Sequence, residues 1–337
     1  MKVDRLEIAY LPTTVRAAAV EARDAGLDGF WLAETRHDPF VALGQATGLD
    51  LDLGTAIAVA FARNPMTVAV QANDLQLLSG GRFHLGLGSQ VEPHITKRFG
   101  MPWSRPAARM REFVLALHAI WDCWETGTRP RFRGEFYTHT LMTDFFDPGP
   151  NPHGRPKVWL AGVGERMTEV AGEVADGFLC HNFTTARYFR EVTLPALERG
   201  RARAGKPPAG LEISGPSLVA CDERGLAEVK RQIAFYGSTP AYRPVLALHG
   251  WESLAEDLHH LSRRGRWQEM SDLIPDEVLH AFAVVGTPTA AAAALTARYA
   301  DHVTRIAAPV LRTSSAPSGG TTPAPEPSAA AAPAPPA

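Results

Sequence analysis

Apolar runs and helical patterns alternate along most of the chain. Eight of the apolar runs have the length and composition of strands, and they span residues 6–11, 29–33, 54–61, 82–87, 158–161, 177–180, 211–220 and 303–307. A nearly continuous apolar run is typical of a strand that helices cover on both faces, as in a parallel sheet. Strands that alternate with helices favour an α/β fold. The order and number of these strands predict a (β/α)8 barrel, the TIM barrel, with insertions after the fourth and seventh strands.

The segment from residue 52 to residue 88 shows this pattern most clearly. Asn64 can cap a helix there, and Pro65 stands at its first position, where a missing N–H group costs nothing. The helical pattern stops at Ser79, which two glycines follow. The next strand ends in small residues at positions 86, 88 and 89, so a ligand can approach the backbone closely. Because ligands collect at the carboxyl ends of parallel strands, this strand end predicts a binding site.

Two longer segments interrupt the alternation, residues 127–156 after the fourth strand and residues 238–279 after the seventh. Insertions of this length commonly form lids or caps over the active face of a barrel. We expect residues 1–312 to form one barrel domain. Residues 313–337 are rich in Pro and Ala and carry a single charge, Glu326, so they bury too little apolar surface to fold. We expect this tail to be disordered and to carry no catalytic residue.

Composition and charge narrow the classes of partner. The formal net charge is −2 and the chain contains no block of Lys and Arg, which argues against nucleic acid or an anionic membrane as the partner. Cys123, Cys180 and Cys221 lie far apart without C-x-x-C spacing, so neither a disulfide framework nor a metal site is predicted. The charged N-terminal residues exclude a secretory signal, and no stretch approaches about 18 uninterrupted apolar residues. We expect a soluble, cytoplasmic protein that acts on a small molecule.

A cluster of charged residues follows the second predicted strand. Glu34, Arg36, His37 and Asp38 stand at a strand end, where a barrel exposes its catalytic groups. A histidine beside carboxylates can move a proton near neutral pH, and an arginine can hold an anion. A structural ion-pair loop on the surface is the alternative, because such pairs are common. We predict Glu34 and His37 as catalytic residues.

A glycine-rich turn, from Gly162 to Met167, follows the fifth predicted strand and opens a helix. Such a turn presents unpaired N–H groups and the positive end of the helix dipole, which together bind anions such as phosphate. Met167 occupies the position of the third glycine in the dinucleotide-binding motif, so that motif is incomplete. An ordinary strand-to-helix turn remains the alternative. The chain contains no H-E-x-x-H, G-x-S-x-G or P-loop lysine motif.

Six segments in order along the chain together resemble the luciferase-like monooxygenase superfamily, in particular its branch of coenzyme F420-dependent oxidoreductases. The segments are DGFWLAETRHDPF (28–40), LGTAIAVAFARNPMTVA (53–69), GRFHLGLGSQ (81–90), FGMPWSRPAARMREFV (99–114), AGVGERMTEVAGEVADGF (161–178) and AVVGTP (283–288). The resemblance covers most of the chain. It implies a (β/α)8 barrel that binds a planar, phosphate-bearing, tricyclic redox cofactor at the carboxyl ends of its strands.

The resemblance also implies which residues bind the cofactor. Relatives often have a non-prolyl cis peptide bond in the third strand, under the cofactor ring, and here it would fall between Ala56 and Ile57. The remaining binding residues fall into two loops. One loop would face the pyrimidine edge of the ring and consists of Gly88, Ser89 and Gln90. The other would hold the phosphate by its backbone N–H groups and consists of Gly162, Val163, Gly164 and Glu165.

The chain departs from these relatives at the end of the second strand. They commonly place a catalytic histidine directly after the acidic residue that ends this strand, whereas Thr35 follows Glu34 here. His37 comes two residues later and would take over the role by a local shift, unless the reaction does not need it.

Three functions remain open from the sequence. The leading hypothesis is an F420-dependent oxidoreductase, in which the deazaflavin gives or accepts a hydride and Glu34 or His37 moves the substrate proton. The first alternative is a monooxygenase that uses reduced FMN and oxygen. The second is a flavin-binding protein without turnover. The Trp and Phe residues of the two insertions suggest an apolar substrate. Relatives are often homodimers, so a homodimer is expected by analogy.

Overall fold

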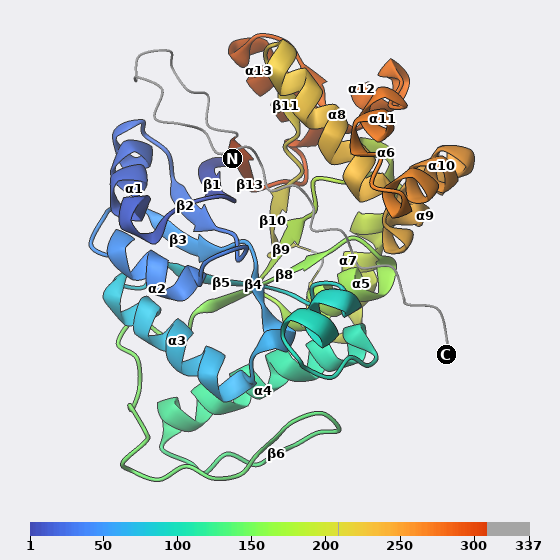
Figure 1. The fold of residues 1–337 in the computed structure, drawn as a ribbon. Coiled ribbons are helices and arrows are strands. Elements are labelled where there is room, and N and C mark those ends of the chain that lie inside the picture. The colour runs from blue at the N-terminus through green and yellow to red at the C-terminus, as the bar shows by residue number, and fades with distance from the viewer. Residues whose placement is uncertain (208, 309–337) are drawn as a thin grey trace. The chain divides into compact units, whose positions relative to one another are not determined.

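The computed structural model describes residues 1–207 and 209–308 of the chain (Figure 1). The predicted tail, residues 313–337, and the predicted domain end at residue 312 lie outside these residues. The described residues divide into two compact units. Unit 1 comprises Met1–His181, Glu191–Gly215 and His302–Ala308, and unit 2 comprises Asn182–Arg190 and residues 216–301.

Unit 1 contains a closed barrel of parallel strands. Its strands are β1 (Lys2–Glu7), β2 (Gly29–Leu32), β3 (Asp52–Thr55), β5 (Phe83–Gly88), β8 (Lys157–Gly162), β9 (Gly177–Cys180), β10 (Glu212–Gly215) and β13 (Arg305–Ala308). They pair in the order β3-β2-β1-β13-β10-β9-β8-β5, and β5 pairs back with β3 through Leu53 and Phe83. The short strand β4 (Ala58–Val59) resumes the course of β3 and also pairs with β5. The predicted eight-stranded (β/α)8 barrel is therefore confirmed.

Three predicted strands differ most from the observed ones. The third, predicted over residues 54–61, is divided into β3 and β4, and its last residues belong to the 3-10 helix η3 (Ala60–Ala62). The first strand runs from Lys2 to Glu7 rather than over residues 6–11, because the buried Asp4 pairs with a charged residue of β13 and so tolerates a place inside the barrel. The seventh strand ends at Gly215, directly before Pro216, which has no N–H group for a strand ladder. The predicted end of that strand instead forms β11 (Val219–Ala220), which pairs with β12 (Val284–Val285) in unit 2. The insertion after the seventh strand therefore spans residues 216–301 and is longer than predicted.

Helices surround the strands of unit 1 (Figure 1). The longer ones are α1 (Val15–Asp24), α3 (Pro65–Leu78), α4 (Pro106–Thr126), α5 (Glu165–Val174) and α7 (Leu194–Arg203), and the short ones are η1 (Pro12–Thr14), α2 (Pro39–Leu43), η2 (Gly44–Ala46), η3 (Ala60–Ala62) and the π-helical turn η4 (His94–Arg98). A further π-helical turn, η5 (Phe189–Thr193), precedes α7. The predicted start of α3 is confirmed, since the Asn64 side chain accepts a hydrogen bond of 3.0 Å from the backbone N–H of Thr67.

The insertion at residues 127–156 lies against helices of unit 1. It contains a hairpin of β6 (Phe132–Arg133) and β7 (Thr138–His139). The carboxylate of Glu112 on α4 accepts hydrogen bonds from three backbone N–H groups of this hairpin turn, and Asn151 donates to the Asn73 side chain of α3 at 3.0 Å. These contacts are with α3 and α4, so they do not support the expectation that this insertion forms a lid over the strand ends.

Unit 2 is mainly helical. Its elements besides β11 and β12 are α6 (Ala186–Tyr188), α8 (Glu223–Gly237), η6 (Pro240–Tyr242), α9 (Arg243–Ala247), α10 (Glu252–Arg263), α11 (Trp267–Asp272), α12 (Asp276–Phe282) and α13 (Pro288–Tyr299). Aromatic rings form part of its core, with Phe183 stacked on Phe282 at a centroid distance of 4.5 Å and on Tyr242 at 5.9 Å. Aromatic stacking of this kind stabilises a core beyond the area it buries.

Charged residues occupy the interior of the barrel. Arg305 has no exposed surface, and its guanidinium donates two hydrogen bonds of 2.7 Å to the carboxylate of Asp4 and one of 2.7 Å to Asp52. The same guanidinium lies 5.4 Å from the ring centroid of Trp31. Trp31 and Trp159 belong to an apolar cluster against which Ala56 and Ile57 pack. The barrel interior is thus a packed core rather than a channel.

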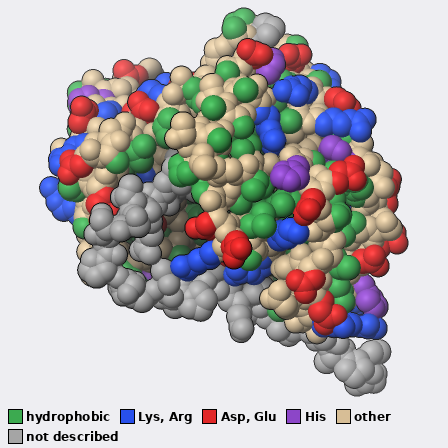
Figure 2. All heavy atoms as spheres, turned by 90° about the horizontal axis from the view of Figure 1, so that it is seen from above, with side chains coloured by type: hydrophobic (Ala, Val, Ile, Leu, Met, Phe, Trp, Pro, Cys, Tyr) green, Lys and Arg blue, Asp and Glu red, His purple; other side chains and the backbone are tan. Residues whose placement is uncertain are grey.

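The charges on the surface and the character of the helices concern the expectation that neither a membrane nor nucleic acid is a partner. Figure 2 shows acidic and basic side chains interspersed over the face that it presents. Among the described residues, no helix combines the length and the apolar character that a membrane crossing requires. The same residues hold no group of three or more His, Cys, Asp or Glu side chains suited to a metal ion.

Candidate active site

The residues predicted from the sequence to form a site lie at one end of the barrel of unit 1. Glu34 follows β2, the Ala56–Ile57 peptide follows β3, Gly88 ends β5 and Gly162 ends β8. All these strands are parallel, so their carboxyl ends meet at the same rim. A direct link joins two of these loops, because the N–H of Glu34 donates to the carbonyl oxygen of Ile57 at 3.0 Å.

Strands β3 and β5 approach each other closely at this rim. The Thr55 hydroxyl donates to the carbonyl oxygen of Gly86 at 2.7 Å and accepts from its N–H at 2.9 Å. A Cβ atom at Gly86 would overlap the carbonyl oxygen of Thr55, and one at Gly88 would lie 2.9 Å from side-chain carbons of Ile57. These two glycines therefore allow the close approach that places Ile57 beside the end of β5. The peptide bond between Ala56 and Ile57 is cis, as the resemblance implied.

Glu34 belongs to a partly buried network of charged groups. Its Oε2 atom accepts hydrogen bonds from the backbone N–H of Val59 at 2.7 Å and from Arg63 at 2.6 Å. Arg63 also donates to Asp38 at 2.8 Å, and Asp38 in turn caps α2 by accepting from Phe40 at 2.9 Å. Burial alone would lower the pKa of Arg63, but Glu34 and Asp38 raise it overall, so this guanidinium stays charged.

Arg63 was not recognised from the sequence. It stands 29 residues after Glu34 and lies within an apolar segment that continues to the helix α3. The one sequence feature that could have pointed to Arg63 is its position directly before the helix cap Asn64. The network shows that ion pairing is part of the role of Glu34, as the structural alternative supposed. All hydrogen bonds that the described residues give to its carboxylate go to Oε2.

His37 lies beside Tyr10, which follows β1. The two ring centroids are 5.9 Å apart, and the Tyr10 hydroxyl donates to the carbonyl oxygen of His37 at 3.4 Å. Burial, together with the nearby charges of Asp38 and Glu34, raises the pKa of Tyr10 to about 12. Tyr10 is therefore a neutral hydrogen-bond donor at physiological pH, next to the predicted pair of Glu34 and His37.

The loop after β5 has a constrained backbone. Gln90 has a φ of 59°, in the left-handed region that non-glycine residues rarely adopt. Its side-chain oxygen accepts from the N–H of Val91 at 3.0 Å, and the Ser89 hydroxyl donates to its carbonyl oxygen at 3.0 Å. Local hydrogen bonds thus hold Ser89 and Gln90 in one conformation at the strand end. Backbone outliers of this kind concentrate at functional sites.

The glycine-rich turn after β8 leads directly into α5. Gly164 occupies the N-cap position with extended backbone, and no side chain caps the helix. A Cβ atom at Gly164 would meet no atom within 4 Å, so space is open where a side chain of this residue would stand. The Glu165 side chain pairs with Arg199 of α7. Uncapped N–H groups and the helix dipole make this turn suitable for an anion.

His181 lies at the same rim and was not predicted as a site residue. It follows β9 directly, and burial lowers its pKa to about 4. Its imidazole is therefore neutral at physiological pH. In the sequence, His181 directly follows the buried strand GFLC, and Glu34 likewise comes shortly after β2. A histidine at a strand end is the feature that could have identified it.

Comparison with known proteins gives consistent matches. A family model described as luciferase-like monooxygenase matches residues 9–305. An uncharacterized protein of Mycobacterium tuberculosis is 53% identical over 297 residues, which cover 86% of this chain and 87% of that protein. A 5,10-methylenetetrahydromethanopterin reductase of Archaeoglobus fulgidus is 25% identical over 284 residues, which cover 79% of this chain and 80% of that enzyme.

A solved structure extends the comparison to the fold. The coenzyme F420-dependent tetrahydromethanopterin reductase from Methanopyrus kandleri superposes with a TM-score of 0.74 at 20% identity. The match covers 91% of this chain and 92% of the reductase chain. At this identity the likeness establishes the shared barrel fold.

Proposed function

Because this chain belongs to the luciferase-like monooxygenase family, we propose that it is a coenzyme F420-dependent oxidoreductase that transfers a hydride between the deazaflavin and a small organic substrate. The name of the Methanopyrus kandleri reductase supports F420 as the cofactor. The observation that carries the proposal is the presence, at one barrel rim, of the Ile57–Gly88 contact and the uncapped start of α5. The first suits a planar ring and the second suits a phosphate.

The residues at this rim fit such a cofactor. Ala56, Ile57 and the loop from Gly88 to Gln90 would hold the ring, since close packing and local hydrogen bonds define their positions. The backbone of Gly162, Val163, Gly164 and Glu165 would hold the phosphate, where Gly164 leaves open space. The bound deazaflavin would supply the carbon that accepts or donates the hydride.

The contacts of Glu34 suggest how this chain handles the proton. Arg63 and the N–H of Val59 both bind the Glu34 carboxylate at Oε2, so Oε1 is the atom that would meet the substrate proton. His37 would exchange that proton with solvent. Tyr10 would hold His37 in place, because its neutral hydroxyl donates to the histidine carbonyl oxygen and the two rings lie side by side. In this proposal, Glu34 and His37 are the catalytic residues.

Titration of the full-length protein with F420 and with FMN, each oxidised and reduced, tests the cofactor. Selective binding of F420 supports the proposal and directs a substrate screen to alcohols, aldehydes and activated alkenes. Selective binding of reduced FMN would replace it with an oxygen-dependent monooxygenase. Binding of neither would overturn the assignment of both loops.

Substitution of Glu34 tests whether the protein turns over. We expect Glu34→Gln to lower kcat about 100-fold with F420 affinity unchanged, because general acid–base catalysis contributes on that order. The matched control is Glu125→Gln, at an exposed carboxylate on α4, which should leave kcat unchanged. Retained cofactor binding with no turnover in the wild-type protein on any screened substrate would favour the flavin-binding protein without activity.

We also propose a homodimer. Helix α3 exposes apolar side chains on the face away from the barrel, with Val70 43%, Leu77 50% and Leu78 58% exposed. A helix that is apolar on both faces is typical of one that another protein surface covers. Sedimentation velocity of the wild-type protein and of a Leu77→Asp variant would test this, and a monomeric wild type would refute it.

A further inference from the structure

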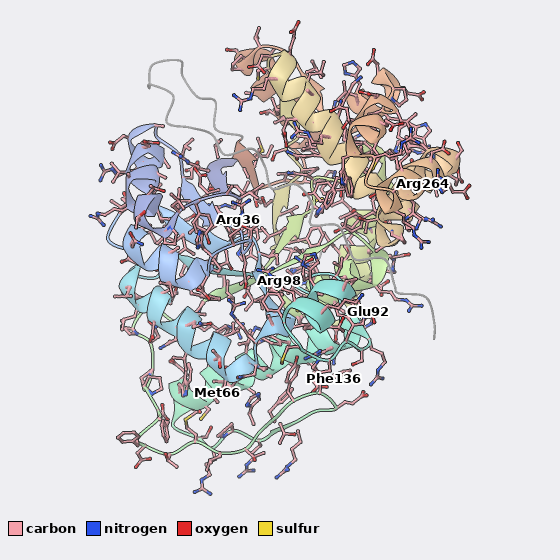
Figure 3. The ribbon with its side chains drawn as sticks, in the orientation of Figure 1. Arg36, Met66, Glu92, Arg98, Phe136 and Arg264 are labelled. Carbon is pink, nitrogen blue, oxygen red and sulfur yellow. The ribbon has the colours of Figure 1, made fainter. Side chains whose placement is uncertain are left out.

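Two arginines stand in loops that meet at the barrel rim, and the mechanism above does not use either of them. Arg36 follows β2, and Arg98 ends η4 in the loop after β5 (Figure 3). The Arg98 guanidinium donates to the carbonyl oxygen of Thr35 at 2.8 Å, so it lies against the residue that precedes Arg36. The pair therefore joins the loops of two strands that also carry Glu34 and Gly88.

Arg98 is held in place before any ligand binds. Besides the hydrogen bond to Thr35, its guanidinium lies over the ring of Phe99, with 4.7 Å to the centroid. Thr35 itself is anchored, because its hydroxyl donates to the carbonyl oxygen of Ile8 at 2.8 Å. An arginine that is ordered in advance loses less side-chain entropy when it binds an anion.

Arg36 is exposed and, within the part of the chain that the structure describes, makes no hydrogen bond or ion pair. The nearest carboxylates of its own loop are engaged, since Glu34 and Asp38 both pair with Arg63. Lys97 adds a further exposed positive charge beside Arg98, and Glu92 is the exposed acidic residue that precedes η4. The rim thus presents guanidinium donors that its own carboxylates do not neutralise.

We propose that Arg36 and Arg98 form a subsite for an anionic group, a carboxylate or a phosphate, of the ligand that binds at this rim. Planar guanidinium groups match the geometry of both anions. The inference rests on the proposed function, since it assigns the rim to a bound ligand. The anionic group belongs either to the substrate or to the side chain of the cofactor. An anionic substrate would revise the apolar substrate suggested by the sequence.

Calorimetric titration of the full-length protein with citrate and with inorganic phosphate at low salt tests the subsite. We expect citrate binding to weaken at least about tenfold in Arg36→Gln and further in the Arg36→Gln/Arg98→Gln double variant, because each loses hydrogen bonds to a charged group. Binding should also weaken with added salt. Arg264→Gln, at an exposed arginine of unit 2, is the matched control and should bind citrate as the wild type does.

Parallel fluorescence titrations with F420 distinguish the source of the anionic group. Weaker binding of citrate alone in the double variant assigns the subsite to the substrate, and weaker binding of both citrate and F420 assigns it to the cofactor. Citrate and phosphate binding by Arg36→Gln at wild-type strength would overturn the subsite, as would the absence of binding to the wild type. Failure of F420 to bind the wild type would overturn the proposed function while the citrate result still stands. Arg36 is exposed and no hydrogen bond or ion pair of the described residues is lost in Arg36→Gln, so we expect this variant to fold.

Discussion

Gly164 offers a direct test of the phosphate site. In the Gly164→Ala variant the added Cβ would meet no protein atom within 4 Å, and the φ of −72° suits any residue. Alanine is a poorer N-cap than glycine, but it also lowers the entropy of the unfolded chain, and each effect is worth about 0.5–1 kcal/mol. We therefore expect the free energy of unfolding to change by less than about 0.5 kcal/mol.

The effect on the ligand should be much larger. The methyl group would stand in the open space beside Gly164, the N-cap of α5, where we propose that the phosphate binds. A hydrogen bond to a charged group contributes about 1.5–3 kcal/mol, so loss of one such bond predicts F420 binding about 10- to 100-fold weaker.

Fluorescence titration of F420 against wild type and Gly164→Ala measures this change, and urea unfolding checks the fold. Gly44→Ala is the matched control, because a Cβ there also meets no atom within 4 Å and its backbone is helical, with a φ of −53°. A Gly164→Ala protein that binds F420 within twofold of the wild type would refute the placement of the phosphate at α5.

Three further predictions concern stability. Arg305→Met should lower the free energy of unfolding by about 3–5 kcal/mol in urea titrations, because it leaves the buried carboxylate of Asp4 unpaired; a loss under 1 kcal/mol would contradict the buried pair. Burial alone would raise the pKa of Asp52, but hydrogen bonds from His84, Lys2 and Arg305 hold it well below its usual range. As the pH falls, Asp52 takes up a proton in the unfolded chain before it does so in the folded protein, so the free energy of unfolding should fall below about pH 3.9. Urea midpoints measured from pH 7 to pH 3 would show this. An Asp52→Asn variant should lose less stability over the same range. Gly172→Ala should cost about 1–3 kcal/mol by overpacking, since its Cβ would overlap the carbonyl oxygen of Leu197 on α7; an unchanged thermal midpoint would mean that the two helices move apart freely.

The strands and helices of the barrel were predictable because their signals are local. The strand at Gly177–Cys180 was predicted at its observed bounds, and α3 begins where Asn64 and Pro65 indicated. Both follow from a run of apolar residues or a cap within a few positions of the element itself. The first strand was misplaced since Lys2 and Asp4 read as surface residues, and only the contact with Arg305 makes the buried position of Asp4 acceptable.

The candidate site was predictable in part for the same reason. Glycines and charged residues at strand ends can be read in sequence, so the positions of Glu34, Gly88 and Gly164 at this rim could be predicted. Arg63 and His181 were missed because nothing near them in the sequence shows which groups they meet. The roles of the site residues stay predictions until the cofactor titration and the substitutions described above are made.

The sequence by itself determined the alternation of strand and helix, and with it the barrel and the end of the barrel at which we predict a ligand. This follows because burial on both faces demands apolar runs, and parallel strands bring their carboxyl ends together. Only the tertiary structure decided which charges are neutralised. Asp4 meets Arg305 across 301 positions and Glu34 meets Arg63 across 29, and these contacts depend on how the strands pair in the closed barrel rather than on any local pattern. Arg36 and Arg98 differ from those pairs, because the same closure brings them to the rim without a carboxylate partner among the described residues.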